Sequence, residues 1–349
     1  MRPYPRALCD GAHTESCRLN CVYAIAAQQL LRATTRLHLE SIRMHELEPQ
    51  SSLRKTRDPA KAVLPAARFR NQQYRHFVLC QALPMILTFA LPFVLPEGWF
   101  GWKWVALMLG MWLLVGGFGV SVGMHRHFAH RAFSAPRWVR VMLAIAGAMA
   151  AQGPVSYWVG IHRRHHTFSD QPGDPHSPHA KANGARSRMS AFFHGHLGWA
   201  ISHDVPMPSR YSADLIRDPA IAWVDRRYWS VVLAGVLVPA IMGMAIHGGY
   251  QGFVLGAYWG GIVRIAFGHN VIWSINSICH AVGRRPYETG DKSRNFSLLS
   301  ILSFGESWHN NHHEKPTSAK FAHHWWQIDI GWTIIRTMRA FRMASNVKR

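Results

Sequence analysis

The chain is short of acidic residues. Of its 349 residues only 18 are Asp or Glu, against 39 Lys or Arg, which gives a formal net charge of +21. A charge of this size would suit nucleic acid, but no zinc-knuckle, helix-turn-helix or aromatic RNA-binding pattern accompanies it. We therefore expect no nucleic-acid partner. We attribute the charge to attraction toward anionic membrane lipids and toward an acidic redox partner or substrate.

Cysteine is also scarce, with five in the whole chain. The three nearest the N-terminus match no zinc-ligand spacing, and the other two lie in or beside apolar stretches, so reduced thiols are expected rather than disulfides. Residues 1–70 form an N-terminal segment to which the sequence assigns no function, and Met44 is a candidate alternative translation start within it. We expect this segment to be cytoplasmic and residues 71–349 to form the functional domain.

Long apolar stretches set the fold class. Four of them are long enough, or nearly so, to cross a hydrocarbon core of about 30 Å, which takes about 20 helical residues. They cover residues 77–96, 102–124, 229–246 and 253–275. A soluble helical protein would need an improbably large core to bury them. The sequence therefore predicts an all-α membrane protein with four transmembrane helices.

The basic residues predict the orientation of these helices. Residues 1–75 carry 13 Lys or Arg and 6 Asp or Glu, residues 125–228 also carry 13 and 6, and residues 276–349 carry 11 and 5. The two remaining connections are nearly uncharged. Because Lys and Arg favour the loops that stay in the cytoplasm, both termini are expected there. A cytoplasmic cap would consist of residues 125–228 and 276–349.

Histidine is frequent in this chain, with 23 copies. Three clusters, H-R-H-F-A-H, H-R-R-H-H and H-N-N-H-H, supply eight candidate ligands, which are His125 and His130, then His162, His165 and His166, then His309, His312 and His313. All three clusters lie on the predicted cytoplasmic side. One triplet alone could be a chance surface run, but three clusters beside apolar spans favour a metal centre, since imidazole is a preferred ligand of transition metals.

Helix geometry supports this interpretation. At about 100° per residue, H-x-x-H-H aims its three rings into one sector of about 100°. His125 and His130 differ, because positions five apart lie about 140° around an α-helix. We therefore expect this pair to approach the site from a bent or terminating helix.

Further landmarks carry a family resemblance. They are Asn276-Ser277-Ile278-Cys279-His280, Asp174-Pro175-His176, the run from Phe192 to Trp199, and Arg285-Pro286-Tyr287. With the three clusters they make the chain, from about Tyr74 to its end, resemble the membrane-bound fatty acyl desaturases of the stearoyl-CoA desaturase type. The resemblance is strongest to their bacterial acyl-CoA desaturase branch.

The resemblance implies a site of two iron ions held by nine histidines and one asparagine. Carried over onto this sequence, the ligands are His125, His130, His162, His165, His166, His280, His309, His312 and His313, with Asn276 reaching one iron through water. It further implies O₂-dependent insertion of a cis double bond into a long-chain acyl substrate, expected to be acyl-CoA, with Δ9 favoured by family frequency.

Two other functions compete with desaturation. A membrane di-iron fatty acyl or alkane hydroxylase could use the same oxidant and would yield an alcohol in place of an alkene. A histidine-rich metal transporter or sensor would instead want its ligands along the membrane path, whereas these clusters lie in the cap.

Substrate residues are less clear from the sequence. Animal acyl-CoA desaturases carry an arginine and an aspartate where this chain has Gly160 and Ile161, which leaves the carrier open between CoA, a carrier protein and a phospholipid. Trp158 matches the family and is a candidate substrate residue. Arg264 lies within the last apolar span, where charges are expensive. It belongs either to a structural network or to the lining of a substrate tunnel.

Electrons must come from another protein. The sequence lacks the H-P-G-G motif of a fused cytochrome b5. We therefore expect a separate ferredoxin, rubredoxin or cytochrome b5 with its reductase. The expected location is a bacterial inner membrane, crossed several times, with the active site facing the cytoplasm.

Overall fold

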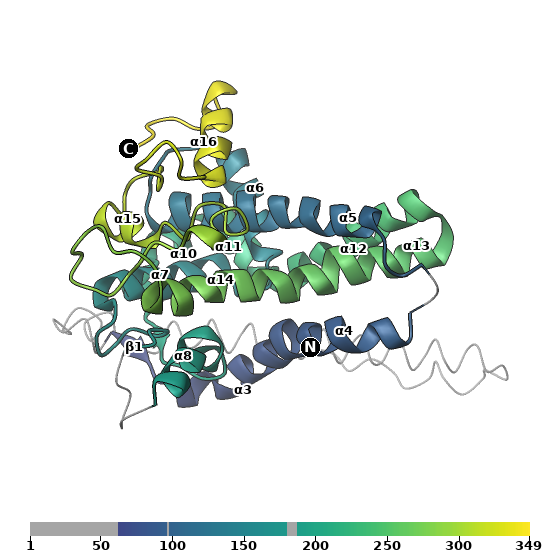
Figure 1. The fold of residues 1–349 in the computed structure, drawn as a ribbon, viewed down its shortest axis with the longest axis horizontal. Coiled ribbons are helices and arrows are strands. Elements are labelled where there is room, and N and C mark those ends of the chain that lie inside the picture. Colours follow the sequence, from purple (N-terminus) through teal and green to yellow (C-terminus); the bar gives the residue numbers. More distant parts are fainter. Residues whose placement is uncertain (1–61, 96–97, 180–186) are drawn as a thin grey trace, which may run out of the picture. The chain divides into compact units, whose positions relative to one another are not determined.

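A computed structural model describes residues 62–95, 98–179 and 187–349 (Figure 1). Most of the expected N-terminal segment, residues 1–61, lies outside the described residues. The first described elements are the short strand β1 (Val63–Leu64) and helix α3 (Ala66–Phe77). Strand β1 pairs antiparallel with β2 (Val205–Pro206). No other strand occurs in the described ranges, and the predicted all-α class is confirmed at this level.

The first two long helices are each built from several consecutive elements. Helix α3 continues through η2 (Val78–Ala82), α4 (Leu83–Ala90) and η3 (Leu91–Phe93), and α5 (Trp102–Trp112) continues into η4 (Leu113–Ala129). Pro84 lies in the first turn of α4, directly after the π-helical turn of η2. Proline has no N–H to donate to the preceding turn, and a local change of helix type accommodates this loss.

The second pair of long helices forms a tight hairpin. Helix α12 (Tyr228–His247) ends at Gly248, and α13 (Gly249–Gly256) is continued by η6 (Ala257–Val263) and α14 (Arg264–Ala281). Gly248 and Gly249 have φ of 85° and 54°, values that glycine adopts without strain. A Cβ atom on Gly243 would lie 2.3 Å from the Gly252 carbonyl oxygen, so these glycines allow the two helices to touch.

Within the described residues, three helices are long and apolar enough to cross a membrane: Ala66–Phe93, Trp102–Ala129 and Tyr228–His247. They overlap three of the four predicted spans, although the first begins well before residue 77. The fourth predicted span, 253–275, is helical throughout but is not one of the three. The structure therefore supports a membrane protein, and the count of four spans remains a prediction.

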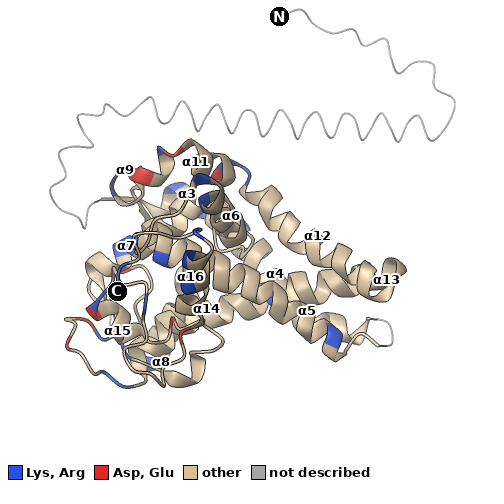
Figure 2. Cartoon of the chain, turned by 90° about the horizontal axis from the view of Figure 1, so that it is seen from above, with Lys and Arg blue, Asp and Glu red and all other residues tan. Residues whose placement is uncertain are grey.

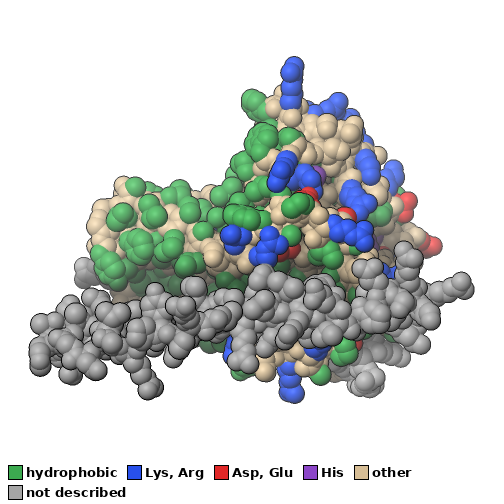
Figure 3. Space-filling view, turned by 180° about the vertical axis from the view of Figure 1, so that it is seen from behind, with side chains coloured by type: hydrophobic (Ala, Val, Ile, Leu, Met, Phe, Trp, Pro, Cys, Tyr) green, Lys and Arg blue, Asp and Glu red, His purple; other side chains and the backbone are tan. Residues whose placement is uncertain are grey.

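The other elements gather at one end of the long helices (Figure 1). They are α6 (Arg137–Ala148), α7 (Val155–Phe168), α8 (Arg188–His196), η5 (Gly198–Ala200), α9 (Pro208–Tyr211), α10 (Ala213–Ile216), α11 (Pro219–Arg226), η7 (Ser297–Leu299), α15 (His309–Glu314) and α16 (Ile330–Ala340). We call this part the cap. Most Lys and Arg residues lie on it, whereas hydrophobic side chains cover the projecting end formed by α12 and α13 (Figures 2 and 3).

Candidate metal centre

Helices α7 and α15 each carry one H-x-x-H-H triplet, and each divides its histidines between two groups. On α7, His162 and His166 belong to a first group and His165 to a second. On α15 the division is reversed, since His309 and His313 belong to the second group and His312 to the first. Residues four apart share a helix face, and the residue between them points toward the neighbouring group.

The remaining two histidines of the first group owe their position to a π-helix. The backbone N–H of His130 donates to the carbonyl of His125 at 3.1 Å, an i→i+5 bond at the end of η4. This bonding stacks residues five apart, which an α-helix would not do. The two rings lie 4.8 Å apart. The predicted terminating helix is present, since η4 ends at Ala129. Its π-helical winding is the physical reason that the two rings lie close together.

Both groups bring their Nε2 atoms close together. In the first group, the distances are 3.1 Å between His125 and His312, 3.0 Å between His312 and His166, and 2.7 Å between His130 and His162. In the second group, His280 and His309 approach to 3.0 Å. Within each group all the available ligand atoms lie within 4.8 Å of one another. The structure thus brings together all nine histidines that the sequence named.

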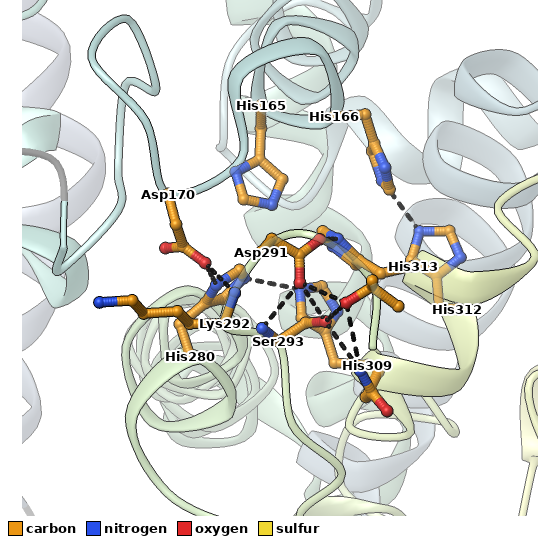
Figure 4. A network of polar contacts seen from close by, with 12 residues as sticks. His165, His166, Asp170, His280, Asp291, Lys292, Ser293, His309, His312 and His313 are labelled. Carbon is orange, nitrogen blue, oxygen red and sulfur yellow. Dashed lines mark hydrogen bonds and ion pairs between the residues drawn. The ribbon is translucent and has the colours of Figure 1, made fainter. Parts of the chain in front are cut away.

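Carboxylates contact the histidines of the second group, and Figure 4 labels two of them, Asp170 and Asp291. The Nδ1 atoms of His165, His280 and His313 each contact one carboxylate, on Asp174 at 2.9 Å, Asp170 at 2.8 Å and Asp291 at 2.6 Å. Such a contact fixes the ring orientation and leaves Nε2 free to bind a metal. The contacts make the imidazoles stronger ligands and orient them before any ion arrives.

In the described part of the chain, one carboxylate contacts the first group. Glu306 contacts Nδ1 of His125, and its other oxygen accepts hydrogen bonds from Ser121 and Arg126. Arg126 is fully buried, also pairs with Asp329 at 2.9 Å, and lies over the Phe321 ring. Glu306 is thereby locked between a histidine and a guanidinium.

Burial keeps most of these imidazoles neutral. Desolvation, followed by the repulsion of neighbouring histidines, holds the pKa of His162, His166, His309 and His312 well below 6.5. Burial also acts to lower the pKa of His165, but the nearby carboxylates, Asp174 foremost, outweigh it and raise that pKa. Neutral imidazole is the form that coordinates metal.

These residues fit a metal pair. Ligand nitrogens about 2.1 Å from one ion, at right angles to each other, lie about 3 Å apart, which matches the observed Nε2 separations. Nε2 of His313 is buried without a hydrogen-bond partner in the described part of the chain. Close, neutral and unpaired nitrogens are costly unless an ion binds between them.

The comparison with known proteins identifies the family. A family model described as "Fatty acid desaturase" matches residues 99–343, most of the chain and all of the histidines above. This chain belongs to the fatty acid desaturase family. The resemblance stated from the sequence is thus confirmed.

Curated relatives of this desaturase vary in substrate. It is 42% identical over 283 residues, 80% of this chain and 87% of the relative, to the hex-5-enoyl-[acyl-carrier protein] acetylenase of Moorena producens. It is 34% identical over 255 residues, 71% and 85%, to the sn-1 stearoyl-lipid 9-desaturase of Anabaena variabilis. It is 29% identical over 297 residues, 84% and 87%, to the acyl-CoA C20 Delta5-desaturase of Anemone leveillei.

Two adjoining cavities lie beside the histidine groups of the desaturase. They share four lining residues, which are Trp158, His162, Ile272 and Asn276. One cavity also reaches His165 and His309, and the other extends to Gln81 and Trp199. Trp158 stacks on the His162 ring and donates its indole N–H to Gln152 at 3.0 Å. The two residues predicted from the family pattern, Trp158 and Asn276, thus face the same space.

Arg264 lies elsewhere. Its guanidinium is buried and donates to three backbone carbonyls, of Gly260, Met149 and Gly235, at 2.7 to 3.1 Å. The residue lines neither of the two cavities. These contacts join Arg264 to the backbone of neighbouring segments. They favour a structural network over the lining of a substrate tunnel, the two roles that the sequence left open for this residue.

Sequence reasoning missed the supporting carboxylates. It noted Asp174 only as a landmark and did not consider Asp170, Asp291 or Glu306. A usable signal was present, since Asp170 and Asp174 follow the second cluster closely and Glu306 precedes the third by three residues. In a chain so poor in acids, carboxylates this close to histidine clusters are candidates for orienting them.

Proposed function

We propose that this protein is an O₂-dependent di-iron desaturase of long-chain fatty acyl groups. The observation that carries the proposal is the pair of adjacent histidine groups, which are buried, hold most of their imidazoles neutral and lie beside two cavities. Family membership supports the same reaction.

The proposed ligands divide between two irons. His125, His130, His162, His166 and His312 would hold the first, and His165, His280, His309 and His313 the second. Asn276 lies one helical turn before His280 on α14, and we assign it a water-mediated contact to the second iron. No other side chain is required as a separate catalytic residue.

Bound irons would supply the oxidising power that acids and bases lack, because an unactivated methylene C–H bond has no acidic proton. The balanced reaction is –CH₂–CH₂– + O₂ + 2e⁻ + 2H⁺ → –CH=CH– + 2H₂O. The chain itself contributes position. Trp158, fixed by its bond to Gln152 and stacked on His162, forms a wall that would hold one carbon pair beside the histidines.

The substrate we propose is acyl-CoA, with a cis double bond inserted at Δ9. The relatives act on lipid-linked, CoA-linked and carrier-protein-linked chains and include 9-, Δ7- and Δ5-desaturases. Carrier and position therefore need direct determination.

The membrane arrangement we propose has four spans, with 253–275 as the fourth, and places the cap and both termini in the cytoplasm of a bacterial cell. The uneven charge distribution supports it (Figure 2). Residues 1–70 would precede a membrane domain of residues 71–349. A separate ferredoxin, rubredoxin or cytochrome b5 would deliver the electrons.

Fatty-acid methyl ester analysis by gas chromatography and mass spectrometry tests the proposal. Cells expressing the wild type should contain a new mono-unsaturated acid that is absent with a His165→Ala/His312→Ala variant, which removes one nitrogen from each group. Fragmentation gives the double-bond position. Hydroxylated products would show the competing hydroxylase instead.

A matched control is available inside the first cluster. His127 belongs to neither histidine group, and its Nδ1 lies 3.1 Å from the Phe133 carbonyl. An asparagine amide can replace that donor, so His127→Asn should retain the product. Unchanged lipids from folded wild type that contains two irons and is supplied with electrons would contradict the proposal.

A further inference from the structure

A surface cleft of about 530 Å³ lies on the cap beside the third histidine cluster. Its lining includes Arg284, Arg285, Phe296, Trp308, His324 and Trp326. Both arginines are exposed, and neither has an ion-pair partner in the described ranges. No carboxylate lines the cleft. Exposed arginines beside tryptophan are typical of a protein-docking surface, and their charge favours an acidic partner.

Aromatic rings connect this cleft to the second histidine group. Trp326 is 48% exposed and meets the ring of Trp308 edge to face, with the ring centroids 5.5 Å apart. Trp308 is buried, and its indole N–H donates to the Ile328 carbonyl at 2.8 Å, which fixes the ring. The next residue in the chain is His309. Two rings and one peptide unit therefore link solvent to that histidine.

We propose that this cleft is the docking site of an acidic one-electron carrier protein, and that Trp326 and Trp308 form the route by which its electrons enter. The inference rests on the proposed function, since the reaction needs two electrons per double bond. A one-electron carrier would therefore dock twice per double bond and lose one electron each time. Together with the electrons from the acyl chain, these two electrons reduce O₂ to water. Electron tunnelling weakens steeply with distance, so a route of contacting rings is better than a gap.

Neighbouring tryptophans offer a matched pair of variants. Trp325 is 96% exposed, and no ring contact joins it to any described residue. Trp326→Leu should slow electron transfer at least tenfold, whereas Trp325→Leu should change it less than twofold. The probe is a reduced plant-type [2Fe–2S] ferredoxin, an acidic carrier whose oxidation is followed by its visible absorbance.

Docking is tested separately from catalysis. Arg284→Glu/Arg285→Glu should weaken the Kd of oxidised ferredoxin for the full-length protein at least tenfold, and the wild-type affinity should fall with salt. The control is Arg336→Glu/Arg339→Glu, which reverses two exposed arginines on α16. Alkene formation driven by reduced methyl viologen, which needs no docking, should be unchanged in the Arg284/Arg285 variant.

The outcomes are distinguishable. Equal affinity for wild type and the Arg284/Arg285 variant, or no wild-type binding of ferredoxin, overturns the docking site. Equal transfer rates for the two tryptophan variants overturn the route. Absence of alkene from wild type with methyl viologen would instead contradict the proposed function, while the binding measurement would still decide the cleft.

Discussion

The two histidine groups differ in the number of carboxylates that contact their histidines. The second group has four histidines, three of which contact Asp170, Asp174 or Asp291. The first has five histidines and one carboxylate, Glu306, which is shared with Arg126. Carboxylates make imidazoles more basic and fix their orientation. The two sites are thus chemically unequal, one relying on ligand number and the other on supported ligands.

The most severe test removes one ligand from each group on the same helix. His309 and His312 lie three residues apart on α15 but belong to different groups. Alanine at either position should lower the iron content from about two per chain to about one and cost more activity than the ~10–100-fold of a supporting residue. Mass-spectrometric metal analysis with Mössbauer spectroscopy should show that different irons are lost. The same iron signal missing from both variants would contradict the two-group assignment.

The supporting carboxylates come next in expected effect. Asp291→Asn should weaken iron at the second group ~10–100-fold, and Glu306→Gln should do the same at the first. Both changes keep the side-chain size and remove the negative charge. Chelator titration of purified protein should release one iron early in each variant. If both variants lose the same iron first, the carboxylates do not act on separate groups.

How far the sequence predicts this site depends on the range of the contacts. Clusters such as H-x-x-H-H are local, so the helices and eight of the nine histidines could be predicted from spacing. His280 lies outside the clusters, and only the family resemblance implied it. The division of each triplet depends on how α7 faces α15, which no local spacing contains. The close approach of His125 to His130 needed π-helical winding, and spacing favours the α-helix by default. Asp170, Asp291 and Glu306 lie in loops whose positions follow from tertiary packing.

The predicted spans and the helices of the structure differ in their bounds for a related reason. Hydropathy detects apolar residues, so the polar helix α3 was not included in the first span although it is continuous with it. The segment 253–275 contains Arg264, His269 and Asn270, polar groups that each hydrogen-bond a backbone carbonyl inside the protein. Its hydropathy is therefore a poor guide to its place in the membrane.

Arg126 tests why the first group manages with one carboxylate. The buried guanidinium pairs with Glu306 and Asp329, whose side chains are 6% and 1% exposed. Arg126→Met would leave both acids buried without their cation, which should cost about 3–5 kcal/mol of unfolding free energy. Thermal or denaturant unfolding in detergent measures this cost. Arg131 is the control, because it is 66% exposed and paired with Asp214, so Arg131→Met should cost less than about 1 kcal/mol.

A test that changes no residue is the acid sensitivity of the iron-free cap. Burial lowers the pKa of His203 and His313 to about 4 and that of His176 to about 3, against 6.5 when unfolded. Below pH 6.5 the unfolded chain therefore binds more protons than the folded one. Stability should fall as the pH decreases from about 6.5 toward 4, by about 1.4 kcal/mol per pH unit for each such histidine.

The carboxylates should not contribute in that pH range. Burial opposes the ionisation of Asp170, Asp174 and Asp291, but their histidine partners outweigh it and hold each pKa well below its usual value. They stay ionised throughout, so these three carboxylates add nothing to the slope. Denaturant unfolding of the iron-free protein between pH 5 and 8 measures it. His203→Asn should reduce the slope by about one histidine's share, because burial lowers the pKa of His203 to about 4. A flat profile below pH 6.5 would mean that the cap histidines are not held neutral by burial.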